Sequence, residues 1–369
     1  MRSAAVIGTG LIGTSIALAL TRRGVSVYLD DVNSAAARTA EAMGAGSCRA
    51  PEEPVDLAVL AVPPARIGTV LAGVQRAGLA HAYTDVASVK ARPHSEMEAA
   101  GADPSSYIGG HPLAGAERSG PLAGRADLFE GRPWVLTPSV RTDRTVLNRA
   151  LELVSLCAGV PVVMDTAAHD EAVALTSHAP HLVAALMAAR LEHAAEPSLR
   201  ISGQGLRDVT RIAGGSPGLW GEILEANSEA VADVLDAFAA DLAGAVAALR
   251  GLRAPDPVRT EQAAAELDAL LTRGNRGHAR VAQKSGAADE VALVPVIIPD
   301  QPGALAELFA AVGAIGVNIE DVRIEHSLDQ PRGLVELFVS RSSAAALSRL
   351  LSDAGWTAPS PDVLVAAPS

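Results

Sequence analysis

The sequence has few cysteines and few aromatic side chains. Cys48 and Cys157 are its only cysteines, and no CxxC motif is present. Neither a disulfide framework nor a cysteine-based zinc site is therefore expected. Aromatic residues make up 3% of the chain, whereas hydrophobic residues make up 49% and charged residues 20%. This alanine-rich composition is typical of a soluble globular protein.

Basic side chains are also scarce relative to acidic ones. The chain has 30 lysines and arginines against 42 aspartates and glutamates, a formal net charge of −12. This balance argues against a nucleic-acid or anionic-membrane partner, although a local basic pocket stays open. No signal peptide precedes the strand-like run AAVIG, and no apolar stretch approaches the roughly 18 residues of a membrane span. The sequence therefore predicts a cytoplasmic protein without a membrane partner.

The length of 369 residues exceeds a single ordinary core and predicts two or three domains. Residues 1–165 alternate strand-like runs with helical patterns. The runs SAAVIG, VSVYLD, DLAVLAVP and AYTDVA resemble strands, and LIGTSIALALTRRG has helical spacing between the first two. This alternation predicts an α/β domain with a Rossmann-type, doubly wound parallel sheet covered on both faces.

Residues 166–285 change to a helical period and predict an all-α domain. Its helices are so rich in alanine and leucine that several must bury more than one face. A helical dimerisation domain explains this pattern, and a monomeric bundle also would; we favour a homodimer because twofold homodimers are common. The charged, glycine-containing run RGNRGHARVAQKSGAADE predicts a trailing linker.

Residues 291–365 predict a small third domain. VALVPVIIP, VNIEDVRIEH and RGLVELFVS are strand-like, while GALAELFAAVGAIG and SSAAALSRLLSDAG are helical. A last strand in WTAPS or VLVA would complete the β-α-β-β-α-β order of a ferredoxin-like domain.

A glycine-rich motif lies directly after the first predicted strand and opens a helix. Gly8, Gly10 and Gly13 have the G-x-G-x-x-G spacing, with Leu11 and Ile12 between the last two. The glycines permit a tight turn and close approach of the backbone to a pyrophosphate, and the helix N-terminus supplies partial positive charge. The motif predicts a dinucleotide site.

An acidic pair ends the next predicted strand about twenty residues further on. Carboxylates of Asp30 and Asp31 would accept hydrogen bonds from ribose hydroxyls. They favour NAD over NADP because a 2′-phosphate would be repelled. Val62 and Pro63 end a later strand and are expected near the same cofactor.

A histidine in the run GGHPLAG is the candidate catalytic base. We expect His111 in a rigid loop near the carboxyl end of the sheet, where ligands of open α/β sheets bind. A neutral imidazole there can take a proton from a substrate hydroxyl while hydride leaves the adjacent carbon for nicotinamide. Arg207 and Arg211 are four residues apart and form a candidate carboxylate clamp on one helix face. The alternative is a solvated face paired with Asp208 or Glu222.

A second pair of histidines is three residues apart in the run SHAPH. His178 and His181 share one face if this run is helical. They are candidates for a metal site, for core or interface positions, or for the substrate site. No metal is expected, because a third ligand is missing unless His169 or Asp170 folds back.

These motifs together resemble the prephenate/arogenate dehydrogenases of tyrosine biosynthesis. The matching pieces occur in the family's order: GTGLIG, YLDDVN, AVPP, TDVASVK, GGHPLAGAERSG, HDEAVALTSHAPH and LRDVTRIAGGSPGLWGEI. The resemblance implies NAD⁺-dependent oxidative decarboxylation of prephenate to 4-hydroxyphenylpyruvate, CO₂ and NADH. The arogenate version of the reaction gives tyrosine directly.

The resemblance also implies residue roles. His111 would accept the proton of the ring 4-hydroxyl, Ser88 would orient that histidine and the hydroxyl, and Arg211 would bind a substrate carboxylate. The other positions implied to line or gate the substrate pocket are Arg207, Glu117, His178, His181 and Trp220. Glu117 favours prephenate over arogenate. Ala87 departs from the glycine more usual in the family at that position.

The third domain resembles an ACT domain through PDQPGALAEL and GVNIEDV. This implies an amino-acid effector site near Gly303 and Asn318, with tyrosine as the candidate ligand.

Two other functions stay open. A dehydrogenase of the β-hydroxyacid type would need a mid-chain helical lysine, which HDEAVALTSHAPHLVAALMAAR lacks. A non-catalytic regulator binding NAD and an amino acid would not need His111, Ser88 and Arg211 together.

Overall fold

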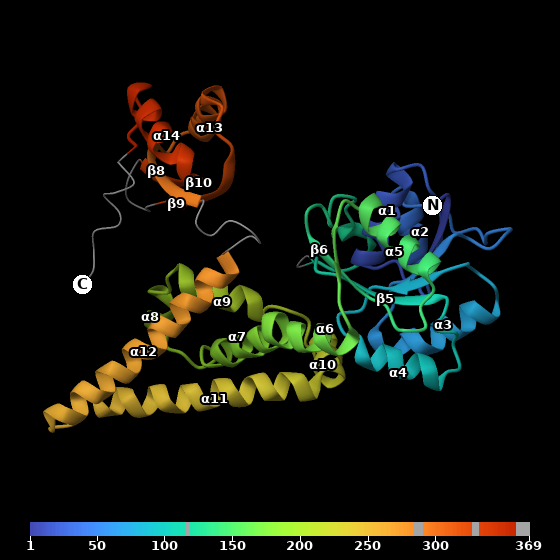
Figure 1. The fold of residues 1–369 in the computed structure, drawn as a ribbon, viewed down its shortest axis with the longest axis horizontal. Helices are drawn as coiled ribbons and strands as arrows, with labels where there is room; N and C mark the ends of the chain where they lie inside the picture. Colours follow the sequence, from blue (N-terminus) through green and yellow to red (C-terminus); the bar gives the residue numbers. More distant parts are fainter. Residues whose placement is uncertain (116–117, 283–290, 327–331, 359–369) are drawn as a thin grey trace. The chain divides into compact units, whose positions relative to one another are not determined.

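The order of strands and helices follows the predicted change from alternating α/β to all-α and back to α/β (Figure 1). The computed structural model describes residues 1–115, 118–282, 291–326 and 332–358. The chain divides into two compact units, Met1–Ala243 and Gly244–Ser369. The first unit contains the glycine-rich motif and every residue predicted to bind substrate.

The main sheet of the first unit is mixed rather than wholly parallel. Its strands pair in the order β2-β1-β3-β4-β5-β6-β7. Their bounds are β1 (Ser3–Ile7), β2 (Ser26–Asp30), β3 (Leu57–Leu60), β4 (Tyr83–Asp85), β5 (Tyr107–Pro112), β6 (Pro133–Thr137) and β7 (Val160–Val163). The strands β2 to β5 are parallel, but β6 is antiparallel to β5. The described part of the β5–β6 connection holds only a short 3₁₀ turn, η2 (Pro121–Ala123), in place of a crossover helix, so the parallel prediction is wrong there.

Helices cover both faces of this sheet, as predicted. They are α1 (Leu11–Arg22), α2 (Ser34–Ala42), α3 (Ile67–Arg76), α4 (Ala91–Ala99) and α5 (Arg144–Leu156). Side chains alternate between the faces along β1, because successive strand residues point in opposite directions. Val6 packs in a core with Ile16 of α1, whereas Ile7 packs in another core with Leu71 of α3. The doubly wound Rossmann-like arrangement is thereby confirmed.

The segment YIGGHP is a strand, which corrects the prediction of a rigid loop around His111. In β5, His111 pairs with Val135 of β6. A Cβ atom at Gly109 would lie 2.4 Å from Thr137 Oγ1, and one at Gly110 would lie 2.5 Å from the Asp85 carbonyl oxygen. The two glycines are therefore needed for close packing beneath β5.

Within its described residues, the predicted helical region consists of helices joined by turns and contains no strand. It contains α6 (Thr166–Val173), a π-helical turn η3 (Ala174–His178), α7 (Ala179–Ala189), α8 (Glu196–Arg200), α9 (Gln204–Ala213), α10 (Pro217–Ala226), α11 (Ser228–Gly251) and α12 (Pro257–Ala282). The linker predicted from residue 273 is wrong up to residue 282, since α12 continues to that point. The alanines and arginines of this run are good helix formers, which outweigh its two glycines. Residues 283–290 of the predicted linker lie outside the described residues.

The continuous helical stretch Thr166–Ala189 is long and apolar enough to cross a membrane by length and composition alone. This differs from the expectation that no stretch approaches such a length. Core helices of globular proteins pass the same test, and here His169, Asp170 and His178 are buried within the first unit. The stretch also packs against α9.

The second unit contains the small α/β region. Its elements are β8 (Val291–Pro299), α13 (Ala304–Ile315), β9 (Ile319–His326), β10 (Arg332–Ser340) and α14 (Arg341–Asp353). The antiparallel strands have the order β8-β10-β9. Thr357 forms a bridge to Ile297 of β8, where a ferredoxin-like domain has its last strand. The predicted VLVA strand lies outside the described residues.

Candidate active site

Two of the three glycines in the turn between β1 and α1 are packed so tightly that a side chain could not be accommodated there. Gly8 has φ of +98°, and a Cβ there would lie 2.2 Å from the Ala61 carbonyl oxygen. A Cβ at Gly13 would lie 1.9 Å from the Gly8 carbonyl oxygen. By contrast, the Cβ position at Gly10 meets no atom within 4 Å, so the space in front of this residue is open.

The helix that follows this turn presents an open N-terminus. Gly10 is the N-cap of α1, no side chain caps the helix, and its first turn holds no acidic residue. Leu11 and Ile12 are half-buried at this end. Unpaired backbone N–H groups and the helix dipole favour an anion here. The turn therefore fits a dinucleotide pyrophosphate.

The acidic pair lies beside this turn. The carbonyl oxygen of Asp30 accepts a hydrogen bond from Gly8 N at 2.8 Å, while its side chain is exposed. The carboxylate of Asp31 accepts from the backbone N and Oγ1 of Thr9, at 2.6 and 2.8 Å. Val62 and Pro63 follow β3, next to the Ala61 carbonyl that touches Gly8. All four predicted positions thus lie around the glycine turn.

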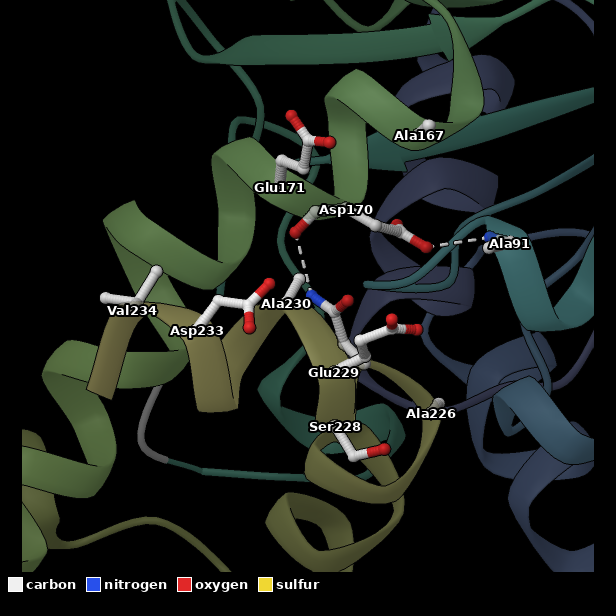
Figure 2. Close-up of a pocket in the computed structure, with 11 residues that line it drawn as sticks. Ala91, Ala167, Asp170, Glu171, Ala226, Ser228, Glu229, Ala230, Asp233 and Val234 are labelled. Atoms are coloured by element: carbon white, nitrogen blue, oxygen red, sulfur yellow. Dashed lines mark hydrogen bonds between the residues drawn. The ribbon is translucent and has the colours of Figure 1, made fainter. Parts of the chain in front are cut away.

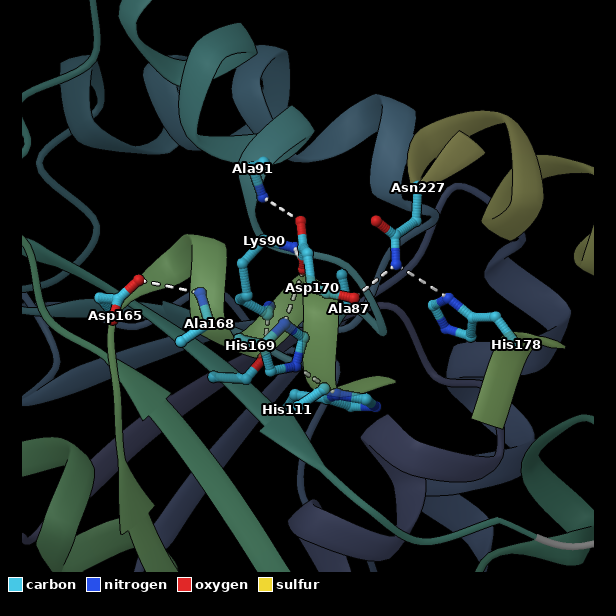
Figure 3. A network of polar contacts seen from close by, with 12 residues as sticks. Ala87, Lys90, Ala91, His111, Asp165, Ala168, His169, Asp170, His178 and Asn227 are labelled. Carbon is cyan, nitrogen blue, oxygen red and sulfur yellow. Dashed lines mark hydrogen bonds and ion pairs between the residues drawn. The ribbon is translucent and has the colours of Figure 1, made fainter. Parts of the chain in front are cut away.

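His111 contacts a buried histidine that sequence reasoning considered only as a metal ligand. His111 Nδ1 lies 2.8 Å from His169 Nε2, and the two rings meet edge to face. His169 Nδ1 in turn lies 2.7 Å from Asp170 Oδ1. Figure 3 shows this row of side chains leading from β5 to α6. Adjacent polar residues at positions 169 and 170 of an apolar helical stretch were the available sequence signal.

Asp170 joins this row to the start of α4. Its Oδ1 accepts a hydrogen bond from Lys90 N, and its Oδ2 accepts one from Ala91 N, both at 2.8 Å. The backbone carbonyl oxygen of Asp170 accepts a hydrogen bond from Asn227 Nδ2 at 2.8 Å. The carboxylate therefore caps α4 from another helix.

The environment of His111 favours its neutral form. Burial holds the pKa of His111 well below its ordinary value, and the positive charges of Lys90, His169 and His178 would lower this pKa further. An uncharged imidazole has a lone pair with which to accept a proton. His111 thus meets the first requirement of a general base at neutral pH.

A buried ion pair lies directly beneath β5. Lys90 Nζ pairs with Asp85 Oδ1 and donates a hydrogen bond to the Gly110 carbonyl oxygen at 2.6 Å. Tyr107 donates its hydroxyl hydrogen to the other oxygen of Asp85. Burial lowers the pKa of Lys90, and Asp85 opposes this change. The pair anchors the strand that carries His111.

The second pair of histidines forms an aromatic cluster with an indole. His181 stacks on Trp220 with ring centroids 3.5 Å apart, and His178 meets Trp220 edge to face at 6.2 Å. His178 Nδ1 also lies 3.1 Å from Asn227 Nδ2. Gly215 lies beneath, since a Cβ there would be 2.2 Å from Trp220 Nε1.

The π-helical turn η3 brings the side chain of His178 closer to the helix face that carries His169. Nine residues separate His169 from His178, which in a regular α-helix means about half a turn, at about 100° per residue. A π-helical turn takes up one extra residue and so removes about 100° of that rotation. The two side chains are thereby placed roughly a quarter of a turn apart. Sequence periodicity does not reveal such a turn.

Comparison with known proteins identifies the chain. Residues 16–163 match the family model of the prephenate dehydrogenase nucleotide-binding domain, and residues 165–262 match that of the prephenate dehydrogenase dimerization domain. The chain belongs to the prephenate dehydrogenase family. It is thus an NAD-dependent oxidoreductase, and the predicted family resemblance is confirmed.

One relative matches nearly the whole chain, and two solved structures each match 76% of it. A probable prephenate dehydrogenase of Streptomyces niveus is 43% identical over 97% of this chain and 99% of its own length. A crystal structure of prephenate dehydrogenase from A. aeolicus, in complex with hydroxyphenyl propionate and NAD⁺, has a TM-score of 0.65 at 26% identity and covers 76% of this chain and 98% of its own. The arogenate dehydrogenase of Synechocystis has a TM-score of 0.62 at 25% identity, over 76% of this chain and 100% of its own.

The structure of this family member does not connect every predicted site residue to His111. Ser88 is half-buried between β4 and α4, and among the described residues no hydrogen bond joins it to His111. Arg207 and Arg211 lie on α9 with exposed side chains. Glu117 lies outside the described residues.

Two further observations bear on ligands of this family member. Within the described ranges, no group of three or more histidine, cysteine or acidic side chains is arranged to hold a metal ion. A cavity of about 520 Å³ lies beside Asp170, lined by Glu171, Glu229 and Asp233 (Figure 2). Its lining does not include His111, so it is separate from the reacting end of the site.

Proposed function

We propose that this protein oxidises prephenate to 4-hydroxyphenylpyruvate, with His111 as the base. The supporting observation is a half-buried imidazole of lowered pKa on β5, a strand parallel to β1. The carboxyl ends of parallel strands share one edge of a sheet, so His111 and the glycine turn after β1 lie on the same edge. A ring bound there would reach both nicotinamide and imidazole.

The reaction needs one group that accepts a proton and positively charged groups that bind the substrate carboxylates. His111 Nε2 takes the proton of the ring 4-hydroxyl as the C4–H bond breaks and the carbonyl forms. NAD⁺, when held by the glycine turn, takes up the hydride from C4. The C1–CO₂ bond then breaks, its electron pair enters the ring, and the proton returns from His111 to the ring oxygen. No net proton is released.

Arg211 and the aromatic cluster are the proposed substrate contacts. Arg211 presents an exposed guanidinium on α9. A guanidinium can bind a carboxylate through two parallel hydrogen bonds. His178, His181 and Trp220 form an aromatic wall within the same unit. Arg207 would line the entrance and Ser88 would orient the hydroxyl. Glu117 would gate the entrance.

Prephenate is the proposed substrate in preference to arogenate. The Streptomyces niveus relative, 43% identical over nearly the full length, is described as a probable prephenate dehydrogenase. The Synechocystis structure shows that arogenate dehydrogenases share this fold, so the fold alone does not discriminate. The two substrates differ in a keto or amino group, which one side-chain contact can read.

The active form is proposed to be a cytoplasmic homodimer, in which the cellular NAD⁺ pool is available. The matched dimerization domain includes all of α11. Phe238, Leu242, Val246 and Leu249 are exposed along this helix at spacings of three and four residues. This spacing forms a single apolar stripe, which a second copy would bury.

The C-terminal region is proposed to be an ACT domain that binds tyrosine. Its described strands and the Thr357 bridge follow the ferredoxin-like order. Gly303 is the N-cap residue before α13, has a φ of +95° and lines a cavity of about 190 Å³. Asn318 is exposed and does not line this cavity. Tyrosine, but not alanine, should raise the thermal midpoint of the full chain; equal midpoints with both would contradict an effector site.

Absorbance at 340 nm tests the main proposal. With NAD⁺, prephenate should produce NADH at a higher kcat/KM than arogenate. His111→Asn should lose most of kcat while keeping the Kd for NAD⁺ within about threefold, because His111 is not part of the glycine turn. Absence of NADH with either substrate would refute the proposed function. Full activity of His111→Asn would refute the assignment of the base.

A further inference from the structure

The side chains of His111, His169 and Asp170 form a row of hydrogen bonds that runs from the reacting edge of the sheet into the interior. Which hydrogen bonds a neutral histidine can form depends on the position of its ring and on which of its two ring nitrogens carries the proton. We infer that His169 and Asp170 are positioning residues that fix the tautomer of His111 and leave its Nε2 as the basic atom. The inference rests on the proposed function of His111 as the base.

Asp170 determines which atom donates and which accepts in each hydrogen bond of the row. Its Oδ1 accepts a hydrogen bond from Lys90 N, and its Oδ2 accepts one from Ala91 N. Both oxygens therefore already act as acceptors, and a carboxylate has no proton to donate. The hydrogen in the 2.7 Å contact between Asp170 Oδ1 and His169 Nδ1 must then belong to His169.

The remaining protons follow by elimination. A neutral His169 with its proton on Nδ1 has a lone pair on Nε2. The 2.8 Å contact between this atom and His111 Nδ1 then requires the proton to be on His111 Nδ1. A neutral His111 with its proton on Nδ1 has its lone pair on Nε2. The opposite tautomer would place a proton on the atom that must accept one.

The row is held rigidly by its surroundings. His169 is 0% exposed and Asp170 5% exposed, so water does not compete for their hydrogen bonds. The Asp170 carboxylate caps α4, its carbonyl oxygen accepts from Asn227, and His111 is paired within the sheet. Ring rotation of His169 would break both of its hydrogen bonds at once.

The row also carries part of the charge when His111 is protonated. The groups whose positive charge would oppose an imidazolium at His111 are Lys90, from the β4–α4 connection, and His169 and His178 when they are protonated. Asp85 pairs with Lys90 and offsets part of its charge, and the Asp170 carboxylate acts through His169. Because the His111 Nδ1 proton stays in place, protonation at Nε2 requires no ring flip.

Histidine tautomers can be observed directly, without substrate. Two-bond ¹H–¹⁵N correlation spectra of the ¹⁵N-histidine-labelled full chain at pH 7.5 distinguish a protonated ring nitrogen from one with a lone pair. His111→Asn and His169→Asn identify the two spin systems. We expect the proton on Nδ1 in both rings of the wild type. A proton on Nε2 of either ring would overturn the inference.

A matched pair of variants tests the consequence for catalysis. His169→Asn keeps an amide near the Nδ1 position but does not reach His111, whereas His169→Gln places an amide oxygen near the Nε2 position as an acceptor. Loss of tautomer control in serine-protease triads costs kcat about 10⁴-fold. We expect a loss of at least about 10²-fold for His169→Asn, with recovery to within about tenfold of wild type for His169→Gln.

Other readouts separate positioning from a general structural effect. The KM for prephenate, the Kd for NAD⁺ and the thermal midpoint should change little in either variant, and His111 of His169→Asn should shift toward the Nε2-protonated tautomer. Glu171→Gln changes the neighbouring carboxylate on α6 and should keep wild-type kcat. Equal kcat values for His169→Asn and His169→Gln would overturn the inference. A wild type inactive toward prephenate and arogenate would refute the proposed function, whereas the tautomer spectra test the row independently.

Discussion

The buried pair of Lys90 and Asp85 allows a stability prediction of large magnitude. Lys90→Met removes a cation whose side chain is 2% exposed from a carboxylate that is 0% exposed. The Gly110 carbonyl oxygen loses its donor in the same change. Tyr107 and the Ala87 backbone N would still donate to Asp85, but without a positive charge.

The expected loss in the free energy of unfolding is about 3–5 kcal/mol, because an uncompensated charge is left in the interior. For a domain of this size, each kcal/mol corresponds to about 2–4 °C, so the thermal midpoint should fall by roughly 10 °C. Calorimetry of the full chain measures this change in the thermal midpoint. Asp85→Asn combined with Lys90→Met should recover most of the loss, since the unpaired charge is gone.

An exposed ion pair provides the control. Arg92 pairs with Glu96 of α4 and with Glu225 of α10 at the surface, and all three side chains are about one-third exposed or more. Arg92→Met should cost less than about 1 kcal/mol, since surface pairs contribute little. If Lys90→Met also cost less than about 1 kcal/mol, or if the double variant were no more stable than Lys90→Met alone, the role given to the buried charge would be refuted.

Three further predictions concern the cofactor, pH and assembly. Gly13→Ala should raise the Kd for NAD⁺ at least about tenfold, because its Cβ would overlap the Gly8 carbonyl oxygen; an unchanged Kd by isothermal titration calorimetry would count against the pyrophosphate site. Burial lowers the pKa of His178 to about 4 from its ordinary value of about 6.5, so the unfolded chain takes up a proton first as pH falls through this range. Stability should therefore fall by about 2 kcal/mol between pH 7 and pH 5 through this residue, and urea unfolding of His178→Asn should lack that part; identical pH dependence in both proteins would contradict the assignment. Leu242→Glu should shift the chain from dimer to monomer in sedimentation velocity, since a charge would enter the apolar stripe of α11; an unchanged sedimentation coefficient would place the interface elsewhere.

Local patterns predicted the elements well where side-chain periodicity reports burial. The strands β1 to β4, the helices around the sheet and the C-terminal elements up to α14 follow from apolar alternation and helical spacing. The reversal of β6 was not predictable in this way, because strand direction depends on how the chain returns and not on local composition. The linker prediction failed at α12 because two glycines were weighed above good helix formers.

The residues of the candidate site also fall into those that local sequence patterns predicted and those that they did not. The glycine motif, Asp31 and His111 were found from the sequence, because each depends on a short motif with its own chemistry. In the sequence, Lys90 was only the last residue of the TDVASVK motif, and His169 was considered only as a metal ligand. Their partners are distant in the chain, since 58 residues separate His111 from His169 and 80 separate Lys90 from Asp170.

The amino-acid sequence alone was enough to place the chain in its family, to locate a glycine-rich turn that fits a dinucleotide, and to single out the histidine that is the proposed base. The folded chain was needed to show that this histidine lies on a strand, packed over Lys90 and Asp85, and that His169 and Asp170 lie behind it. Motifs encode chemistry through neighbouring residues, whereas tautomers and pKa values depend on which distant groups the fold brings within hydrogen-bond distance.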